Sequence, residues 1–233
     1  MFRTLLAVAL CAMTLAGCAT QTHQQITQLN RVEAKQPRIL LMPINVELSE
    51  MAASGMLEPK ADWTDAANKF MIAALRDENA KRNVHMTEFD EEKAPVDKRD
   101  DIQQLNKLHG VVGQSIMIHQ YIQQLALPTK EGKFDWSLGP NARALKELYG
   151  ADYALFVYVR DSYTTAGRAA MIVLAAVFRV HLQGGTQVGF ASLVDLDTGN
   201  VVWFNRLARP SGDLRTEVAA QETVQTLIAG LPQ

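Results

Sequence analysis

Apolar residues along this chain form short continuous runs that alternate with longer stretches of helical spacing. The run RILLMPINV, residues 38–46, is apolar at successive positions, which is typical of a strand buried on both faces of a sheet. Pro43 is expected to mark the end or the edge of that strand. Further strands are predicted at residues 84–89, 153–159, 186–196 and 200–207.

Four stretches repeat apolar residues every three to four positions, as amphipathic helices do. They cover residues 62–83, 101–127, 138–150 and 213–232. In the first helix, the positions at helical spacing are Ala66, Phe70, Ala73, Ala74 and Asp77, and Thr64 or Asp62 is expected to cap it. The third is expected to end at Gly150, because glycine adopts the left-handed backbone of a helix C-cap at little cost.

Strands and helices that alternate in this way predict an α/β fold. We expect a single three-layer domain over residues 38–233, with a mixed sheet flanked by helices and a C-terminal hairpin followed by a terminal helix. About 200 residues are enough to bury a substantial core.

The first 17 residues have the pattern of a signal peptide. Arg3 precedes an apolar run at 5–15, which is shorter than the roughly 20 residues that a membrane-spanning helix needs. The next residues, Leu15-Ala16-Gly17-Cys18, resemble the lipobox of bacterial lipoproteins.

That resemblance implies cleavage before Cys18 and attachment of a diacylglycerol to its thiol, with acyl chains such as palmitate in the lipid. Because no aspartate follows the cysteine, it also implies the periplasmic face of the outer membrane as the location. An ordinary signal peptide with a chance cysteine is the alternative. Residues 18–37 are rich in Gln and Thr, so we predict a polar tether with a mean reach of about 25 Å.

Charge and cysteine content narrow the function classes. The net charge of -2 favours neither a nucleic-acid surface nor a polybasic membrane patch. Cys11 leaves with the signal peptide and Cys18 carries lipid, so no thiol is left for a disulfide, a redox pair or a metal site. The charged stretch 88–101 is predicted as a solvated loop. We expect no cofactor beyond the covalent lipid on Cys18.

The letters Asp197-Thr198-Gly199 match the residues around the catalytic aspartate of aspartic proteases. Those enzymes need two carboxylates that share a proton, and this chain has one such triplet. Asp197, Thr198, Gly199 and Asn200 also lie between two strand patterns and are good turn formers. We therefore predict a hairpin turn, with an aspartate-dependent hydrolase as the third choice of function.

Other catalytic patterns are absent from the sequence: a phosphate loop, HExxH, GxSxG and a metal-ligand cluster. His109 and His119 are ten residues apart, which does not give the i, i+4 spacing of two metal ligands on a helix. His119 is expected to be a partly buried histidine on the apolar stripe of its helix. We predict no metal and no small-molecule substrate.

An uninterrupted apolar decapeptide, AAMIVLAAVF, runs from Ala169 to Phe178. It is too short for a transmembrane helix, and it lacks the apolar–polar alternation expected of a lipid-facing strand. We favour a buried strand or a short core helix. A membrane-contacting or self-associating patch and a pore hairpin are the alternatives.

Three pieces of sequence occur in a familiar order: the RILLMPINV strand, the LKELYGADYALFVYV join and the ASLVDLDTGNVVWFNR hairpin before a terminal helix. Together they resemble bacterial envelope lipoproteins built on the TolB amino-terminal-domain fold. Relatives of that group include the curli secretion channel subunit and an activator of a peptidoglycan synthase, and the uncharacterised members are the most similar.

The resemblance implies a non-enzymatic binding or assembly accessory of the cell envelope, with envelope proteins or its own copies as partners. A subunit of an oligomeric secretion or transport channel is the alternative. Trp203 and Phe204 lie on opposite faces of a predicted strand, so one is expected in the core and the other is a candidate partner surface.

Overall fold

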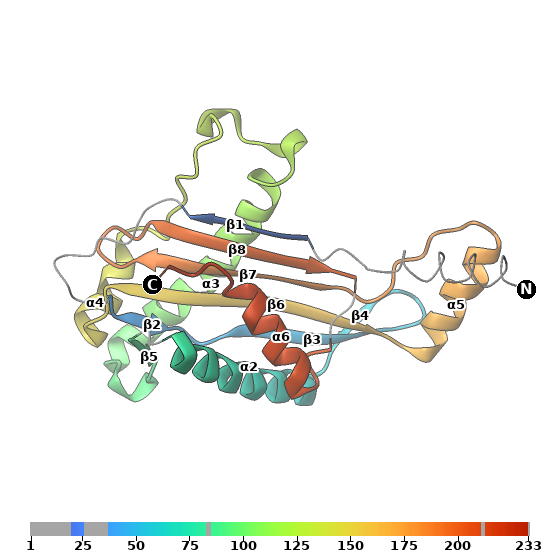
Figure 1. Cartoon of the computed structure of the whole chain (residues 1–233), viewed down its shortest axis with the longest axis horizontal. Coiled ribbons are helices and arrows are strands. Elements are labelled where there is room, and N and C mark those ends of the chain that lie inside the picture. The colour runs from blue at the N-terminus through green and yellow to red at the C-terminus, as the bar shows by residue number, and fades with distance from the viewer. Residues whose placement is uncertain (1–19, 26–36, 83–84, 211–212, 233) are drawn as a thin grey trace, which may run out of the picture.

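The computed structural model describes residues 20–25, 37–82, 85–210 and 213–232. Its strands form one eight-stranded sheet in the order β1-β8-β7-β6-β2-β5, with β3 pairing both β6 and β4 (Figure 1). The strands are β1 (Thr20–Gln25), β2 (Ile39–Leu41), β3 (Asn45–Met51), β4 (Leu57–Pro59), β5 (Met86–Glu88), β6 (Tyr153–Thr164), β7 (Gln187–Asp195) and β8 (Val201–Arg209).

Strand β6 is the centre of the sheet. It pairs antiparallel with β7 along one edge, and its other edge pairs in parallel first with β2 and then with β3. The break between β2 and β3 falls at Pro43, which cannot donate a backbone hydrogen bond. The predicted strand at 38–46 is therefore two strands, with the proline at the boundary as expected.

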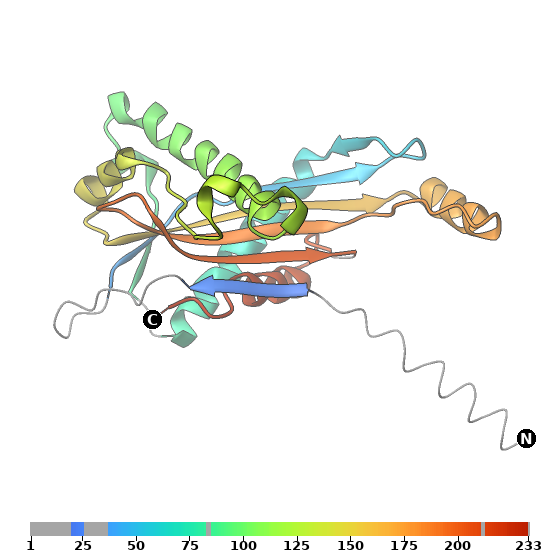
Figure 2. The same cartoon turned by 90° about the horizontal axis from the view of Figure 1, so that it is seen from above.

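Helices cover both faces of the sheet (Figure 2). One face carries α2 (Ala61–Arg82) and α6 (Glu217–Leu227), and the other carries α3 (Val96–His119) and α4 (Arg143–Tyr149). The prediction of an α/β domain with a mixed sheet between helical layers is confirmed.

Successive side chains of β6 point alternately into two hydrophobic cores, one on each face of the sheet. Leu155, Val157 and Val159 pack toward α2 and α6, whereas Ala154 and Phe156 pack toward α3 and α4. All five are at most 1 % exposed. Because β6 is buried on both sides, its run of apolar residues lacks the alternation of a half-exposed strand.

The join between α4 and β6 follows the predicted pattern. Gly150 has a φ of 66° and its N–H donates to the carbonyl of Lys146 at 2.8 Å, which closes the helix. Asp152 then accepts from the backbone N–H of Arg38 at 3.0 Å and from its guanidinium at 3.1 Å. This pairing lowers the pKa of Asp152 and holds the start of β2 against β6.

Three local predictions need correction. Helix α2 buries Ala67, Met71 and Leu75 besides the expected Ala74, whereas the expected Phe70 is only partly buried against the same core. Thr64 accepts from the N–H of Leu48 at 2.9 Å and so ties α2 to β3. The charged stretch 88–101 is not one loop, because α3 already begins at Val96.

Part of the predicted tether belongs to the sheet. Residues Thr20–Gln25 form β1, which pairs antiparallel with β8 so that Thr20 lies opposite Ala208. An edge strand is held by backbone hydrogen bonds on one side, so a polar sequence such as TQTHQQ can form one without any apolar pattern.

Candidate functional site

The apolar decapeptide forms α5 (Ala166–Val177), a helix between β6 and β7. Thr165 caps it, because its hydroxyl oxygen accepts from the N–H of Arg168 at 3.1 Å. Alanines at five of its twelve positions favour helix over strand. The helix ends at Phe178, and Arg179 takes a left-handed φ of 58° to turn the chain back. We call residues 165–186 the α5 arm.

Hydrogen bonds at its base hold the α5 arm. The guanidinium of Arg168 donates to the carbonyl of Gln183 at 3.1 Å and to that of Ala53 at 3.3 Å. Gly185 donates to the hydroxyl of Thr164 at 2.7 Å, and a Cβ at Gly185 would lie 2.1 Å from the carbonyl oxygen of Ser162. The arm is therefore attached to β6 and to the turn between β3 and β4 by polar contacts.

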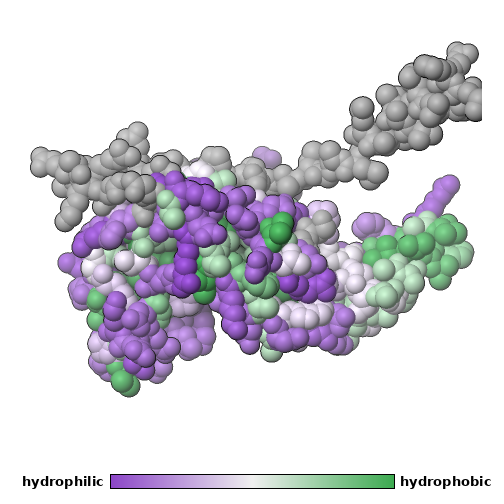
Figure 3. All heavy atoms as spheres, turned by 60° about the horizontal axis from the view of Figure 1, so that its bottom comes forward, coloured by the Kyte–Doolittle hydropathy of each residue, from purple (hydrophilic) through white to green (hydrophobic). Residues whose placement is uncertain are grey.

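No residue of α5 is buried. The prediction that 169–178 enters the core is wrong, because the helix extends past the ends of the strands, where neither core can cover it (Figure 1). Figure 3 shows the apolar surface gathered at this end of the molecule. The large apolar side chains of the arm, 45–73 % exposed, are Met171, Val173, Leu174, Val177, Phe178 and Val180.

The Asp-Thr-Gly sequence forms the turn between β7 and β8, as predicted. Asp195, rather than Asp197, organises it: its Oδ1 accepts from the N–H groups of Asp197 and Thr198, both at 2.9 Å. Gly199 has a φ of 75°, and Asn200 follows it at the start of β8. Asp197 points outward and forms an ion pair with Lys146 of α4.

Trp203 and Phe204 lie on opposite faces of β8, as expected, but neither forms an exposed surface. Trp203 belongs to the core under α2 and α6, and Phe204 to the core under α3 and α4. Both side chains are fully buried, because helices cover both faces of the sheet. The proposed partner surface at these residues is wrong.

His119 is partly buried, as expected, and His109 is fully buried. Its Nε2 lies 2.9 Å from the hydroxyl oxygen of Ser192, and its ring stacks on Phe156 at 4.8 Å. Burial lowers the pKa of His109 to about 3, so the ring is neutral. It is enclosed between α3 and the sheet, which makes it a structural group. His119 lies at the end of α3, where its Nδ1 is 2.7 Å from the carbonyl of Leu125.

A second polar cluster lies under α6. Oδ2 of Asp161 accepts from the amide of Gln187 at 2.8 Å and from the hydroxyl of Tyr163. Gln187 in turn accepts from Arg209 at 2.7 Å, and Arg209 pairs with Glu222 of α6. Burial raises the pKa of Asp161. The cluster links β6, β7 and β8 to helix α6 through hydrogen bonds and an ion pair, so its role is structural.

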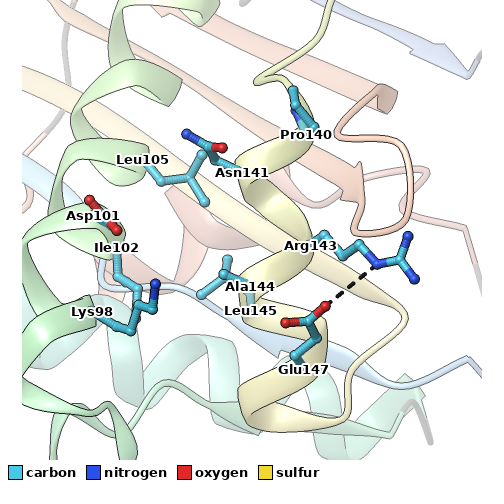
Figure 4. Close-up of a pocket in the computed structure, with 10 residues that line it drawn as sticks. All are labelled: Lys98, Asp101, Ile102, Leu105, Pro140, Asn141, Arg143, Ala144, Leu145 and Glu147. Carbon is cyan, nitrogen blue, oxygen red and sulfur yellow. Dashed lines mark ion pairs between the residues drawn. The ribbon is translucent and has the colours of Figure 1, made fainter.

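A groove of about 320 Å³ lies between α3 and α4 (Figure 4). Its buried lining residues, Ile102, Leu105 and Leu145, are apolar. The polar side chains around it, including Arg143 and Glu147, are exposed. An open groove without a fixed polar group cannot orient a small molecule strongly.

The remaining predicted site residues, Leu15, Ala16, Gly17 and Cys18, lie outside the described residues. Within the described part of the chain, no group of three His, Cys, Asp or Glu side chains could hold a metal ion. No helix among those residues is long and apolar enough to cross a membrane.

Comparison with known proteins gives only loose likeness, and it is to solved structures. No family model matches the chain, and no curated protein matches it significantly. Two solved structures, both of a PelC dodecamer from Paraburkholderia phytofirmans and one of them a point variant, align with 91 % of this chain and 96 % of their own. The identity is 12 % and the TM-score 0.42, so the fold is loosely related and the likeness carries no argument about function.

Proposed function

We propose that this protein is a non-enzymatic accessory of the bacterial cell envelope, anchored through lipid on Cys18 to the periplasmic face of the outer membrane, and that it works by contact through the α5 arm. The observation that carries the proposal is the exposed apolar helix α5, none of whose residues is buried. Large exposed apolar patches on soluble domains mark surfaces that bind proteins or membranes.

The surroundings of the reactive side chains support a binding role. Asp197 is paired with Lys146 and lies on the outside of a turn. His109 is enclosed between aromatic rings, and one carboxylate oxygen of Asp161, Oδ2, accepts hydrogen bonds that join strands. These groups have structural contacts, whereas the large apolar side chains of α5 are exposed.

The alternative function, a channel subunit, predicts a different molecule in contact with the α5 arm. A channel assembled from copies of this chain requires contacts between identical arms or between an arm and a neighbouring copy. An accessory requires contact with another component of the envelope. The two can be separated by the identity of what lies next to Val173, which is 69 % exposed in the middle of α5.

Photo-crosslinking in living cells tests the proposal. A photoreactive amino acid is placed at Val173, and in a control strain at Val218, a 79 % exposed valine of α6. We expect crosslinked products at Val173 that are missing at Val218, and loss of metabolic labelling with radioactive palmitate in a Cys18→Ala variant. The proposal fails if Val173 gives no more products than Val218, or if Cys18→Ala is labelled as the wild type is.

A further inference from the structure

The register of the sheet brings the start of β1 to the end of the molecule that carries the α5 arm. Thr20 pairs with Ala208, and the neighbouring Arg209 pairs with Gln187, which pairs with Asp161. Asp161 is only four residues before Thr165, where the arm begins. Figures 1 and 2 both show the first residue of β1 and the α5 arm toward the same end of the strands.

In the sequence, Cys18 precedes Thr20, the first residue of β1, by two positions, and two residues span at most about 7 Å. From β1 to β6 there are three strand spacings, about 14 Å in all. Lipid on Cys18 would hold the α5 end of the domain within a few side-chain lengths of the bilayer.

The chemistry of the arm suits that surface. The whole chain has 25 Asp and Glu residues, about one in nine, yet residues 162–194 contain none. Within this stretch the basic side chains are Arg168, Arg179 and His181. A helix apolar on its outer side and flanked by cations matches acyl chains beneath anionic headgroups.

The neighbouring turn between β3 and β4 extends the same surface. Met56 and Leu57 are 69 % and 53 % exposed, and Arg168 bonds this turn to the arm through the carbonyl of Ala53. The carboxylates of Glu50 and Glu58 in this hairpin pair with Lys60, which offsets one of their two negative charges.

We propose that the α5 arm inserts into the headgroup region of the bilayer that holds the lipidated Cys18, as a second attachment point that orients the domain. The inference rests on the proposed lipid anchor. The acyl chains hold the protein at the membrane, and the arm selects which end of the sheet faces it. A protein partner or a second copy at the arm are the competing outcomes.

Vesicle binding tests insertion without the acyl chains. The chain from residue 18 onward, carrying Cys18→Ala, has no thiol, so a single cysteine at Val173 can carry an environment-sensitive fluorophore. With vesicles of phosphatidylglycerol and phosphatidylethanolamine, we expect a blue shift and quenching by a lipid-borne quencher. The same fluorophore at Val218 should show neither, and neutral phosphatidylcholine vesicles should bind more weakly.

A pair of variants separates the arm from other apolar surface. Leu174→Glu with Val177→Glu should weaken vesicle binding about tenfold or more, because two exposed apolar side chains lose their contact with lipid. Leu108→Glu with Val111→Glu, on the outer face of α3, should leave it unchanged. Circular dichroism should be unaltered in both, since all four side chains are exposed.

Orientation is tested with the lipidated protein in liposomes. A cysteine at Val173 should be protected from a water-soluble thiol reagent, whereas one at Val96, near the opposite end of the sheet, should react fully. Equal reaction at both positions, or no blue shift with anionic vesicles, overturns the inference.

Other results assign the arm differently. If Leu174→Glu abolishes self-association in lipid-free solution and no vesicle shift is seen, the arm binds a second copy. Protein crosslinks at Val173 in cells without a vesicle shift assign it to another protein. Both results overturn membrane insertion but leave contact through the arm intact, whereas unchanged palmitate labelling of Cys18→Ala removes the anchor itself.

Discussion

Asn205 closes the C-terminal end of α6 from the neighbouring strand. The side chain projects from β8, is 1 % exposed, and donates through Nδ2 to the carbonyls of Thr226 at 2.8 Å and Leu227 at 2.9 Å. A longer contact of 3.4 Å reaches the carbonyl of Ala229. The last carbonyls of a helix have no partner within the helix, so one amide group here satisfies several.

Replacing Asn205 with alanine should lower the free energy of unfolding by about 1–3 kcal/mol. The buried carbonyl of Leu227 loses its donor, and an unsatisfied buried group costs about 1–3 kcal/mol, whereas the carbonyl of Thr226 still accepts from the N–H of Ala229. The Oδ1 of Asn205 accepts no hydrogen bond from the described part of the chain, so its removal offsets part of this loss. Asn205→Asp should cost more than alanine, since it places an oxygen against the same carbonyls.

Urea unfolding followed by circular dichroism measures these changes on the chain from residue 18 with Cys18→Ala. Asn200→Ala is the matched control, because Asn200 is exposed at the hairpin turn and should change stability by less than about 0.5 kcal/mol. A loss below about 1 kcal/mol for Asn205→Ala would show that the amide does not hold α6. An Asn205→Asp variant as stable as wild type would refute the electrostatic part of the reasoning.

Three further changes have defined outcomes. Gly113→Ala would place a Cβ 2.0 Å from the ring of Phe190, so overpacking should lower the thermal midpoint and reduce the free energy of unfolding by about 1–3 kcal/mol. The control is Gly167→Ala, whose Cβ would have its nearest neighbour 3.8 Å away and whose stability should be unchanged or slightly raised. Because the pKa of His109 falls to about 3 in the folded protein, from 6.5, only the unfolded chain gains a proton as the pH drops below 6.5. Stability from urea titrations should therefore fall by up to about 1.4 kcal/mol per pH unit between those values, and His109→Gln should flatten this slope. Asp197→Asn breaks an ion pair that is half exposed, so it should lower the free energy of unfolding, measured with urea, by less than about 1 kcal/mol. Crosslinking at the arm should be unchanged. Loss of that crosslinking would indicate a functional role for the carboxylate.

Helix ends, turns and the central buried strand could be predicted from the sequence, because each depends on residues close together in the chain. Gly150 ends α4 because a left-handed residue is needed there, and Gly199 turns the hairpin for the same reason. The apolar run of β6 predicted burial on both faces, and the two cores confirm it. Errors of phase arose in α2, where neighbouring apolar residues such as Phe70 and Met71 fit either of two faces.

The candidate site could not be predicted in the same way. An apolar run predicts that its residues are buried, but it does not show whether they are buried by the same chain or by another molecule. For 169–178 we expected the core, yet the helix is long, apolar and uncovered by its own domain. The strand at Thr20–Gln25 was missed for the opposite reason, since backbone pairing at a sheet edge leaves no apolar pattern.

Strand β1 and helix α5, which were not predicted correctly, lie at the same end of the sheet. If residues 18–37 were a free tether, the lipid on Cys18 would set a distance from the membrane but no orientation. Pairing of β1 with β8 removes that freedom and places the start of β1 at the α5 end of the sheet. The opposite end, where the Asp197 turn meets α4, is then separated from the arm by the length of β6, about 40 Å for its twelve residues. A domain held in this way presents its hairpin turn and the α3–α4 groove away from the bilayer, where soluble partners can reach them.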